Sequence, residues 1–331
     1  MYQAHLRKED KGMKKIGVLT SGGDAPGMNA AIRAVVRTAH HYNLKVVGIK
    51  RGYTGLLKGE IKEMNVSSVG DIIHKGGTIL KSSRCEKMKS DEGIQAASTI
   101  LKEHEIEGLV VIGGDGSFQG ANKLSRENIQ VIGIPGTIDN DLPYTDYTIG
   151  FDTALNTVLD AISKIRDTSM SHEKVTIIEV MGRCCGDIAL YAGLAGGAES
   201  ILIPEKQYEL SDIAQKLLQG KKRGKAHNII VLAEGRGSAE DLKKEILQQT
   251  GIESRVTVLG FLQRGGAPTA FDRILASQMG AKAVELLLEG KSNCAIGIRD
   301  NHLIADNICD AIKKEKVFAD DLFKLSQILS I

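Results

Sequence analysis

The chain has 331 residues, of which 42% are hydrophobic and 25% charged. This is enough apolar material for one large or two ordinary cores, which excludes a disordered or fibrous protein. Lys and Arg total 43 against 41 Asp and Glu, and so near a balance argues against binding nucleic acid by bulk charge. The absence of Trp and the 4% aromatic content argue further against binding single strands by base stacking. Any anion site must therefore be local.

The N-terminal segment and the cysteines indicate the cellular compartment of the protein. Residues 1–12 form a polar N-terminal extension without the apolar segment of a secretory signal. No apolar run approaches the ~20 residues that a membrane helix needs, so we expect a soluble protein. The cysteines are odd in number and lack CxxC spacing, which favours free thiols in a reducing cytoplasm. They are Cys85, Cys184, Cys185, Cys294 and Cys309.

Short Val, Ile and Leu runs alternate with helical patterns along the chain. The expected strands, in order, are residues 14–20, 45–50, 108–113, 130–135, 175–180, 200–204, 228–235, 255–260 and 294–298. The clearest expected helices are residues 29–42, 91–104, 152–167, 211–220 and 271–290. Nearly continuous apolar strands indicate burial on both faces of a sheet. The alternation predicts an α/β protein with mostly parallel sheets, and the length favours two lobes with a boundary near Gly150.

Two glycine-rich loops follow predicted strands, where open α/β sheets bind their ligands. Residues 21–29, SGGDAPGMN, lead into a helix whose free N–H groups suit a phosphate. Residues 113–117, GGDGS, set the Asp115 carboxylate among backbone amides, where magnesium bound to phosphates would find a hard oxygen ligand. The alternatives are an unliganded turn in the first loop, and an Asp115 or Ser117 helix cap in the second.

Two further loops supply charged side chains. Residues 135–141, PGTIDND, place Asp139 and Asp141 two positions apart, so that one carboxylate can accept a proton while the other orients it or helps to hold metal. An Asx-turn cluster would look similar. Residues 181–187, MGRCCGD, end a strand with Arg183, which can bind a phosphate in bidentate fashion or lie on the surface.

Taken together, the loops resemble those of the bacterial ATP-dependent 6-phosphofructokinases. The resemblance runs from about Lys14 to beyond Gly297 in an unbroken order of motifs. These are LTSGGDAPGMNAAIR, GGT, VVIGGDGS, PGTIDND, YTIGFDTA, EVMGR, AGGAE, AEG, TVLG and QRGG. The family implies two Rossmann-like three-layer lobes with the active site in the cleft between them. It implies an ATP-binding lobe of residues 13–150, rejoined by about 268–305, and a sugar-phosphate-binding lobe of 151–267 with the C-terminal 306–331.

The resemblance also implies the reaction, in which the γ-phosphoryl group of Mg²⁺-bound ATP passes directly to the C1 hydroxyl of fructose 6-phosphate. Asp139 matches the base, Asp141 its support, Thr137 a contact to the transferred group, and Arg183 the group that stabilises charge during transfer. Asp115 matches the metal-linked carboxylate. The predicted nucleotide contacts are Gly23, Tyr53 on the adenine, Arg84, Cys85, Gly114, Asp115, Gly116 and Ser117.

Sugar recognition in the family uses residues of both a chain and its neighbour, which implies a homotetramer. The matching positions are Thr137, Asp139, Lys174, Met181, Gly182, Arg183, Glu234, Arg255, Phe261 and Arg264. Two of them depart from the family pattern, because Lys174 stands where an arginine is usual and Phe261 where a histidine is usual. Lysine keeps the charge but loses the planar fork, and phenylalanine loses a donor, so substrate affinity is in question more than reaction type.

The family also has an effector site between subunits that binds ADP or phosphoenolpyruvate. Arg33 and Arg37 lie at i and i+4 and therefore share a helix face, although such a face is more usually just solvated. The full set of matching positions is Arg33, Arg37, Arg166, Gly197, Glu199, Arg223 and Lys225.

Three alternatives differ in class. Pyrophosphate-dependent members of the wider family carry Asp and Lys where this chain has Gly116 and Gly136, so the glycines favour ATP. A non-catalytic metabolite-binding paralogue is supported only by Lys174 and Phe261. A dinucleotide-dependent oxidoreductase would need GxGxxG after the first strand, which residues 21–29 do not supply.

Overall fold

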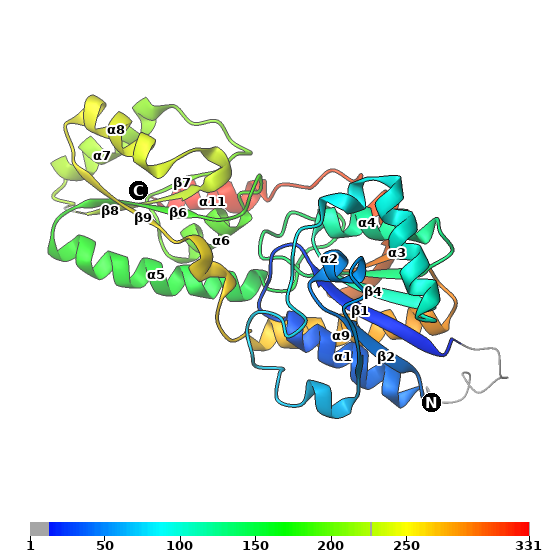
Figure 1. Cartoon of the computed structure of the whole chain (residues 1–331). Helices are drawn as coiled ribbons and strands as arrows, with labels where there is room; N and C mark the ends of the chain where they lie inside the picture. Colours follow the sequence, from blue (N-terminus) through cyan, green and yellow to red (C-terminus); the bar gives the residue numbers. More distant parts are fainter. Residues whose placement is uncertain (1–12, 226, 331) are drawn as a thin grey trace.

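The computed structural model describes residues 13–225 and 227–330, so the polar extension expected at residues 1–12 lies outside the described residues. The described chain forms two lobes, each built on its own sheet (Figure 1). We call the group around the larger sheet the first lobe and the group around the smaller sheet the second lobe. No helix among the described residues combines the length and apolarity required to cross a membrane.

The larger sheet contains seven of the strands in the described residues, and its five central strands are parallel. Each of the two edge strands is antiparallel to its neighbour: β3 pairs with β2, and β11 pairs with β10. In spatial order the strands are β11 (His302–Asn307), β10 (Cys294–Arg299), β5 (Gln130–Pro135), β4 (Gly108–Gly113), β1 (Lys15–Ser21), β2 (Lys45–Ile49) and β3 (Ile61–Met64).

Helices cover both faces of this sheet, because the central strands bury apolar side chains on alternate sides. In β4, for example, Val110 and Ile112 belong to one apolar cluster, and Leu109 and Val111 to the other. One face is covered by α1 (Met28–His41) and α9 (Ala270–Leu288). The other is covered by α2 (Gly52–Leu56), α3 (Asp91–Glu103), α4 (Asp115–Ser125) and α10 (Ile308–Ala311).

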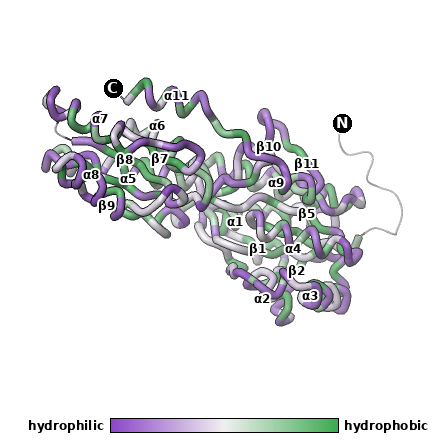
Figure 2. Tube along the Cα trace, turned by 90° about the horizontal axis from the view of Figure 1, so that it is seen from above, coloured by the Kyte–Doolittle hydropathy of each residue, from purple (hydrophilic) through white to green (hydrophobic). Residues whose placement is uncertain are grey.

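The smaller sheet contains four parallel strands of the described chain, in the order β7 (Ser200–Leu202), β8 (Asn228–Ala233), β6 (Val175–Val180) and β9 (Ser254–Val258). One face packs on α5 (Phe151–Ser171) and α6 (Asp187–Ala195), the other on α7 (Leu210–Lys222) and α8 (Ala239–Thr250). Helix α11 (Asp320–Leu329) lies beside α6 (Figure 2). Short 3-10 helices η1 (Val66–Val69), η2 (Glu86–Lys89), η3 (Glu234–Arg236) and η4 (Gly260–Arg264) complete the described chain.

The predicted fold class, α/β with mostly parallel sheets in three-layer lobes, is confirmed. Each of the nine expected strands is present, but β3 and β11 were not expected from the sequence. These two edge strands are largely exposed, so they lack the continuous apolar run that marks a buried strand. The expectation of burial on both faces is wrong for β9, which is a half-exposed edge strand.

The chain passes between the lobes three times, at residues 136–150, 259–269 and 312–319. The third passage comes later than the predicted change near residue 305, because Ile308 and Ala311 of α10 still pack in the apolar cluster under α4. In Figure 1 it is the red segment that leads to α11.

The buried Asp272 carboxylate connects the end of the first passage to the end of the second by hydrogen bonds. Asp272, in the first turn of α9, is fully buried, and its Oδ1 accepts the Gly150 N–H at 2.8 Å. Its Oδ2 accepts the backbone N–H and the hydroxyl of Thr153 at 2.8 and 2.5 Å. Burial raises the pKa of Asp272 to about 6, against the opposing effect of these hydrogen bonds. The starts of α5 and α9 are thereby held against each other.

We expect Asp272→Asn to lower the free energy of unfolding by about 1–3 kcal/mol, because the amide nitrogen cannot accept the bonds that a buried carboxylate oxygen accepts. The raised pKa means that the protonated carboxyl favours the folded state; this stabilisation is complete below the ordinary pKa of 3.8 and is lost as the pH rises through about 6. The difference in melting temperature between wild type and variant should therefore shrink from pH 4.5 to pH 7.5.

Thermal unfolding over that pH series measures the difference. Asp241→Asn is the matched control, since Asp241 is an exposed residue of α8 paired with Lys244. A difference that stays constant or widens with pH would contradict the role of Asp272.

Candidate functional site

Loops from both lobes meet around one cavity of about 560 Å³. The loops after β1, β4 and β5 come from the first lobe, and Arg183 and Arg264 come from the second. Strand β1 lies between β2 and β4, so the chain reverses its direction of winding there, which is the expected ligand position in an open α/β sheet. The predicted site residues that line the cavity are Gly23, Tyr53, Arg84, Cys85, Gly114, Asp115, Gly116, Ser117, Thr137, Asp139, Asp141, Arg183 and Arg264.

The two glycine-rich loops lead into α1 and α4, and neither helix has a side-chain cap at its N-terminus. Gly114 precedes α4, and neither Asp115 nor Ser117 caps that helix. Asp115 Oδ2 instead accepts a hydrogen bond from Gln119 Nε2 at 2.8 Å, and the Ser117 hydroxyl donates to Ser21 O at 3.1 Å. This excludes the helix-cap alternative for the GGDGS loop. The Ser117 N–H donates to Gly114 O at 3.0 Å, which leaves the Asp115 and Gly116 N–H groups at the start of α4 available to an anion.

Asp139, which is buried, and Asp141, which is half-buried, are paired carboxylates of the cavity. Asp139 is only 3% exposed, its N–H donates to Thr137 Oγ1 at 3.2 Å, and Oδ1 of each aspartate lacks a hydrogen-bond partner among the described residues. Burial raises the pKa of Asp139, and the neighbouring Asp141 raises it further. Burial also raises the pKa of Asp141, while Arg183 opposes this. Raised pKa values and unpartnered oxygens favour proton transfer or ligand binding over a purely structural Asx turn.

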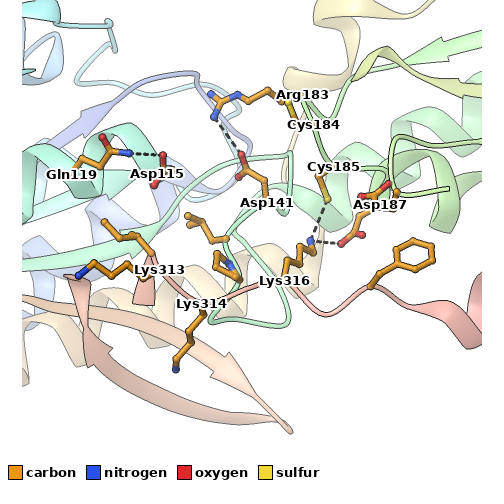
Figure 3. A pocket seen from close by; sticks show the side chains of 15 residues that line it. Asp115, Gln119, Asp141, Arg183, Cys184, Cys185, Asp187, Lys313, Lys314 and Lys316 are labelled. Carbon is orange, nitrogen blue, oxygen red and sulfur yellow. Dashed lines mark hydrogen bonds and ion pairs between the residues drawn. The ribbon is translucent and has the colours of Figure 1, made fainter. Parts of the chain in front are cut away.

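Arg183 reaches both carboxylates from the second lobe. Its Nη1 lies 3.3 Å from Asp141 Oδ2 (Figure 3), and its Nε lies 3.8 Å from Asp139 Oδ2. The side chain remains 55% exposed, so it is accessible from the cavity. The guanidinium therefore contacts both aspartates and is still exposed enough to bind a ligand. A side chain that simply lay on the protein surface would not make these contacts.

The second-lobe loop that carries Arg183 is held by its own hydrogen bonds. Glu234 Oε1 accepts the N–H groups of Gly182 and Arg183 at 3.2 and 2.8 Å. Gln263 is fully buried, and its Oε1 accepts the Met181 N–H at 3.1 Å. Met181, Gly182 and Glu234 thus adjoin the cavity behind Arg183 and do not line it.

Three predicted sugar contacts lie away from this chain's cavity. Lys174 precedes β6, whereas Met181 follows it, and a strand of that length spans roughly 20 Å. Lys174 Nζ pairs with Glu253 Oε2 at 3.4 Å. Arg255 is exposed on the edge strand β9, and Phe261 on η4 is 82% exposed. None of the three lines the cavity of its own chain.

The predicted effector residues divide into two groups. Glu199 pairs with Lys225 at 2.9 Å and lies 3.8 Å from Arg166 Nη1, and Arg166 Nη2 donates to Gly197 O at 2.8 Å. Arg223 follows α7 nearby in the chain. Arg33 and Arg37 lie on α1 in the first lobe, and no contact joins them to the Glu199 group among the described residues.

Tyr53 occupies a different kind of position from an exposed stacking ring. It is 2% exposed, and its hydroxyl donates to Ser117 O at 2.7 Å. The ring packs beneath Gly120 of α4 and forms part of the cavity wall. Gln119, Gly120 and Lys123 of α4 also line the cavity, although no motif marks them. Their spacing from Asp115 along the helix is the sequence signal that places them there.

The oxygen-rich part of the cavity fits a hard divalent cation better than a soft one. Asp115 and the unpartnered Oδ1 atom of Asp141 supply carboxylate oxygens, the donors that Mg²⁺ prefers. A second cluster, Cys185, Asp187 and Glu205, also has ligand spacing. There, however, Asp187 pairs with Lys316 at 2.6 Å and Glu205 accepts the Gly186 N–H at 2.8 Å, so these groups are already used.

Comparison with known proteins agrees with this geometry. The family model described as Phosphofructokinase matches residues 15–287. An ATP-dependent 6-phosphofructokinase of Clostridioides difficile (strain 630) is 64% identical over 319 residues, which is 96% of this chain and 100% of the relative.

Solved structures show the same fold. Phosphofructokinase from Saccharomyces cerevisiae superposes with a TM-score of 0.85 at 35% identity over 96% of this chain, which spans about half, 48%, of the yeast chain. A pyrophosphate-dependent phosphofructokinase from Marinobacter aquaeolei superposes with a TM-score of 0.82 at 28% identity, over 93% of this chain and 86% of that one. The chain belongs to the phosphofructokinase family.

Proposed function

We propose that this chain is an ATP-dependent 6-phosphofructokinase of the cytoplasm, which converts ATP and fructose 6-phosphate into ADP and fructose 1,6-bisphosphate. The observation that carries the proposal is the meeting of the buried Asp139 and the half-buried Asp141 with Arg183, opposite the uncapped start of α4. A phosphate chain at α4 and a sugar at the second lobe would bring donor and acceptor together at Asp139. The 64% identical relative supports the same activity.

The first lobe, in this proposal, binds the nucleotide. Gly23, Gly114 and Gly116 offer backbone N–H groups to the phosphates, and Arg84 offers a guanidinium. Ser117, Cys85 and Tyr53 form the wall beside them. Mg²⁺ would be held through Asp115, and it would neutralise phosphate charge during transfer. The second lobe binds the sugar phosphate through Arg183, Arg264 and the Met181–Gly182–Glu234 loop.

Asp139 then acts as the base for the C1 hydroxyl. A carboxylate whose pKa is raised by burial is a stronger base than an exposed one, provided that it is ionised. Arg264 and, to a smaller extent, Arg183 lower the pKa of Asp139 and so keep its ionised form accessible. Arg183 also stabilises the charge that moves toward the acceptor. Thr137 contacts the transferred group, and Asp141 supports Asp139. Activity should fall as the pH drops through the pKa of Asp139.

The exposed sugar contacts support a homotetramer. Lys174, Arg255 and Phe261 do not line the cavity of their own chain, so we infer that they contribute to the site of a neighbouring copy. Val258 and Leu262, beside them on β9 and η4, are also exposed apolar side chains, and a second copy would cover them together with the open edge of β9.

The choice of phosphoryl donor depends on one open position. A Cβ at Gly136 would lie 2.8 Å from Ile112 Cγ2, so close packing explains this glycine with or without a nucleotide. A Cβ at Gly116 would meet no atom within 4 Å. Packing therefore does not require glycine at position 116, and the space there is available to the ligand.

We expect turnover to require ATP and Mg²⁺ and to be negligible with pyrophosphate. Gly116→Asp should lower kcat/KM for ATP by about tenfold or more, because a like charge about 4 Å from a phosphate costs up to a few kcal/mol. Gly116→Ala is the matched control, since it fills the same space without charge. Initial rates with each donor decide the point, and comparable wild-type rates with both donors would overturn the assignment.

We expect Asp139→Asn to lower kcat by about 10² to 10⁴, the usual cost of losing a general base, with much smaller changes in the apparent KM values. Asp115→Asn should instead show a dependence on magnesium concentration. Steady-state kinetics over a magnesium series separates the two. A kcat above about a tenth of wild type for Asp139→Asn would move the role of base to Asp141.

A regulatory site between copies is the least direct part of the proposal. Arg166, Gly197, Glu199, Arg223 and Lys225 would bind ADP or phosphoenolpyruvate together with Arg33 and Arg37 from another copy. Both effectors should then shift the fructose 6-phosphate saturation curve, and Arg223→Ala should reduce the shift without changing kcat. Saturation kinetics with each effector tests this, and a hyperbolic curve insensitive to both would leave these residues as a solvated face.

A further inference from the structure

Lys316 lies in the third passage between the lobes, outside every motif that the sequence analysis used. Its ammonium group bonds to Asp187 Oδ2 at 2.6 Å and to Cys185 Sγ at 3.3 Å (Figure 3). It also donates a hydrogen bond to the main-chain carbonyl oxygen of Asn140. Asp187 begins α6 in the second lobe, and Asn140 lies in the first passage, in the loop that follows β5 of the first lobe. A single side chain thus joins the third passage to both lobes beside the active site.

Asn140 is the residue between the two catalytic aspartates, and it is held by both its main chain and its side chain. Its φ is 51°, in the left-handed region. Its Nδ2 donates to Asp187 Oδ2 at 2.9 Å, and its Oδ1 accepts the Thr148 N–H at 3.0 Å. Asp187 therefore receives hydrogen bonds from both Asn140 and Lys316.

The aspartates need this support because they have few contacts of their own. Oδ1 of Asp139 and Oδ1 of Asp141 lack hydrogen-bond partners among the described residues, and Arg183 is 55% exposed. The direction of both carboxylates is consequently set by the backbone that carries them. The Asn140 carbonyl belongs to the peptide plane that joins Asn140 to Asp141, so a bond to this oxygen limits rotation of that plane.

The charge on Lys316 makes the bond a strong one. Although burial alone disfavours the ammonium, the nearby Asp187 carboxylate holds the pKa of Lys316 above its ordinary value. Burial, followed by the nearby Asp187, raises the pKa of Cys185 to about 12, so the thiol stays neutral. The charged donor meets one carboxylate and one carbonyl, and such charge-assisted bonds are stronger than neutral ones.

We propose that Lys316 is a positioning residue for phosphoryl transfer, which fixes the Asp139–Asn140–Asp141 backbone from the far side of the cavity through its bond to the Asn140 carbonyl. The inference rests on the proposed function, because it assigns to Lys316 the orientation of the proposed base. It also makes the third passage, and with it α11, part of the support of the active site.

The neighbouring lysine shows that the contact is specific. Lys314 lies in the same passage, and it pairs with Asp306 on β11 at 2.5 Å. Its side chain points away from the catalytic loop in Figure 3. It therefore offers a matched control with the same charge, the same segment and no bond to Asn140.

The test compares Lys316→Met with Lys314→Met by steady-state kinetics and thermal unfolding. Methionine keeps most of the stem and removes the charged donor. We expect kcat of Lys316→Met to fall about 10- to 100-fold, as for a small displacement of a reacting group, while both apparent KM values change less than about threefold. Lys314→Met should retain wild-type kcat, and Lys316→Arg should recover part of the loss.

The outcomes separate this inference from the proposed function. An inactive wild-type enzyme would overturn the proposed function, whereas an active wild type with a folded Lys316→Met variant of unchanged kcat would overturn the role of Lys316 alone. A loss confined to KM or to melting temperature would also overturn it, since that indicates substrate binding or stability. If Lys316→Met does not fold, Lys316→Gln, which keeps a neutral donor, must still lower kcat for the proposal to hold.

Discussion

The site depends on the backbone conformation at Asn140, because this residue joins Asp139 to Asp141 and so sets how the two carboxylates are directed. Two carboxylates lie two residues apart in a buried loop, and burial raises the pKa values of both. Such a pair is costly to bury unless nearby charges and hydrogen bonds hold it. Arg183 supplies the charge, and the bonds around Asn140 supply the geometry. Removing either would leave the aspartates buried but poorly oriented.

The two-lobe architecture follows from the same need. The aspartates come from the first lobe and Arg183 from the second, so the site exists only when the lobes keep a fixed relation. Asp272 fastens the first two passages to each other, and Lys316 ties the third to both lobes. An apolar cluster that continues from Ile138 and Phe151 to Ile188 fills the space between these polar ties. Precise placement of reacting groups across two lobes is what phosphoryl transfer requires.

Much of the site could be predicted because its residues lie in contiguous motifs directly after strands. The loops after β1, β4 and β5 meet at one edge of a parallel sheet, so strand order alone brings Gly23, Asp115 and Asp139 together. The missed cavity residues, such as Gln119, lie one turn further along a helix. Gln263 was missed because a buried glutamine that orients a backbone N–H has no motif of its own.

The sequence by itself determined the α/β class, the position of nearly all strands along the chain and the loops that line the cavity, because apolar runs and glycine-rich turns act locally. The tertiary structure alone decided that β3, β9 and β11 are exposed edges, since strand pairing depends on distant segments. It also decided that Lys174, Arg255 and Phe261 lie away from their own cavity, and that Lys316 meets Asn140, 176 positions earlier in the chain. Contacts between residues so far apart leave no local pattern, because they arise only when the lobes have packed.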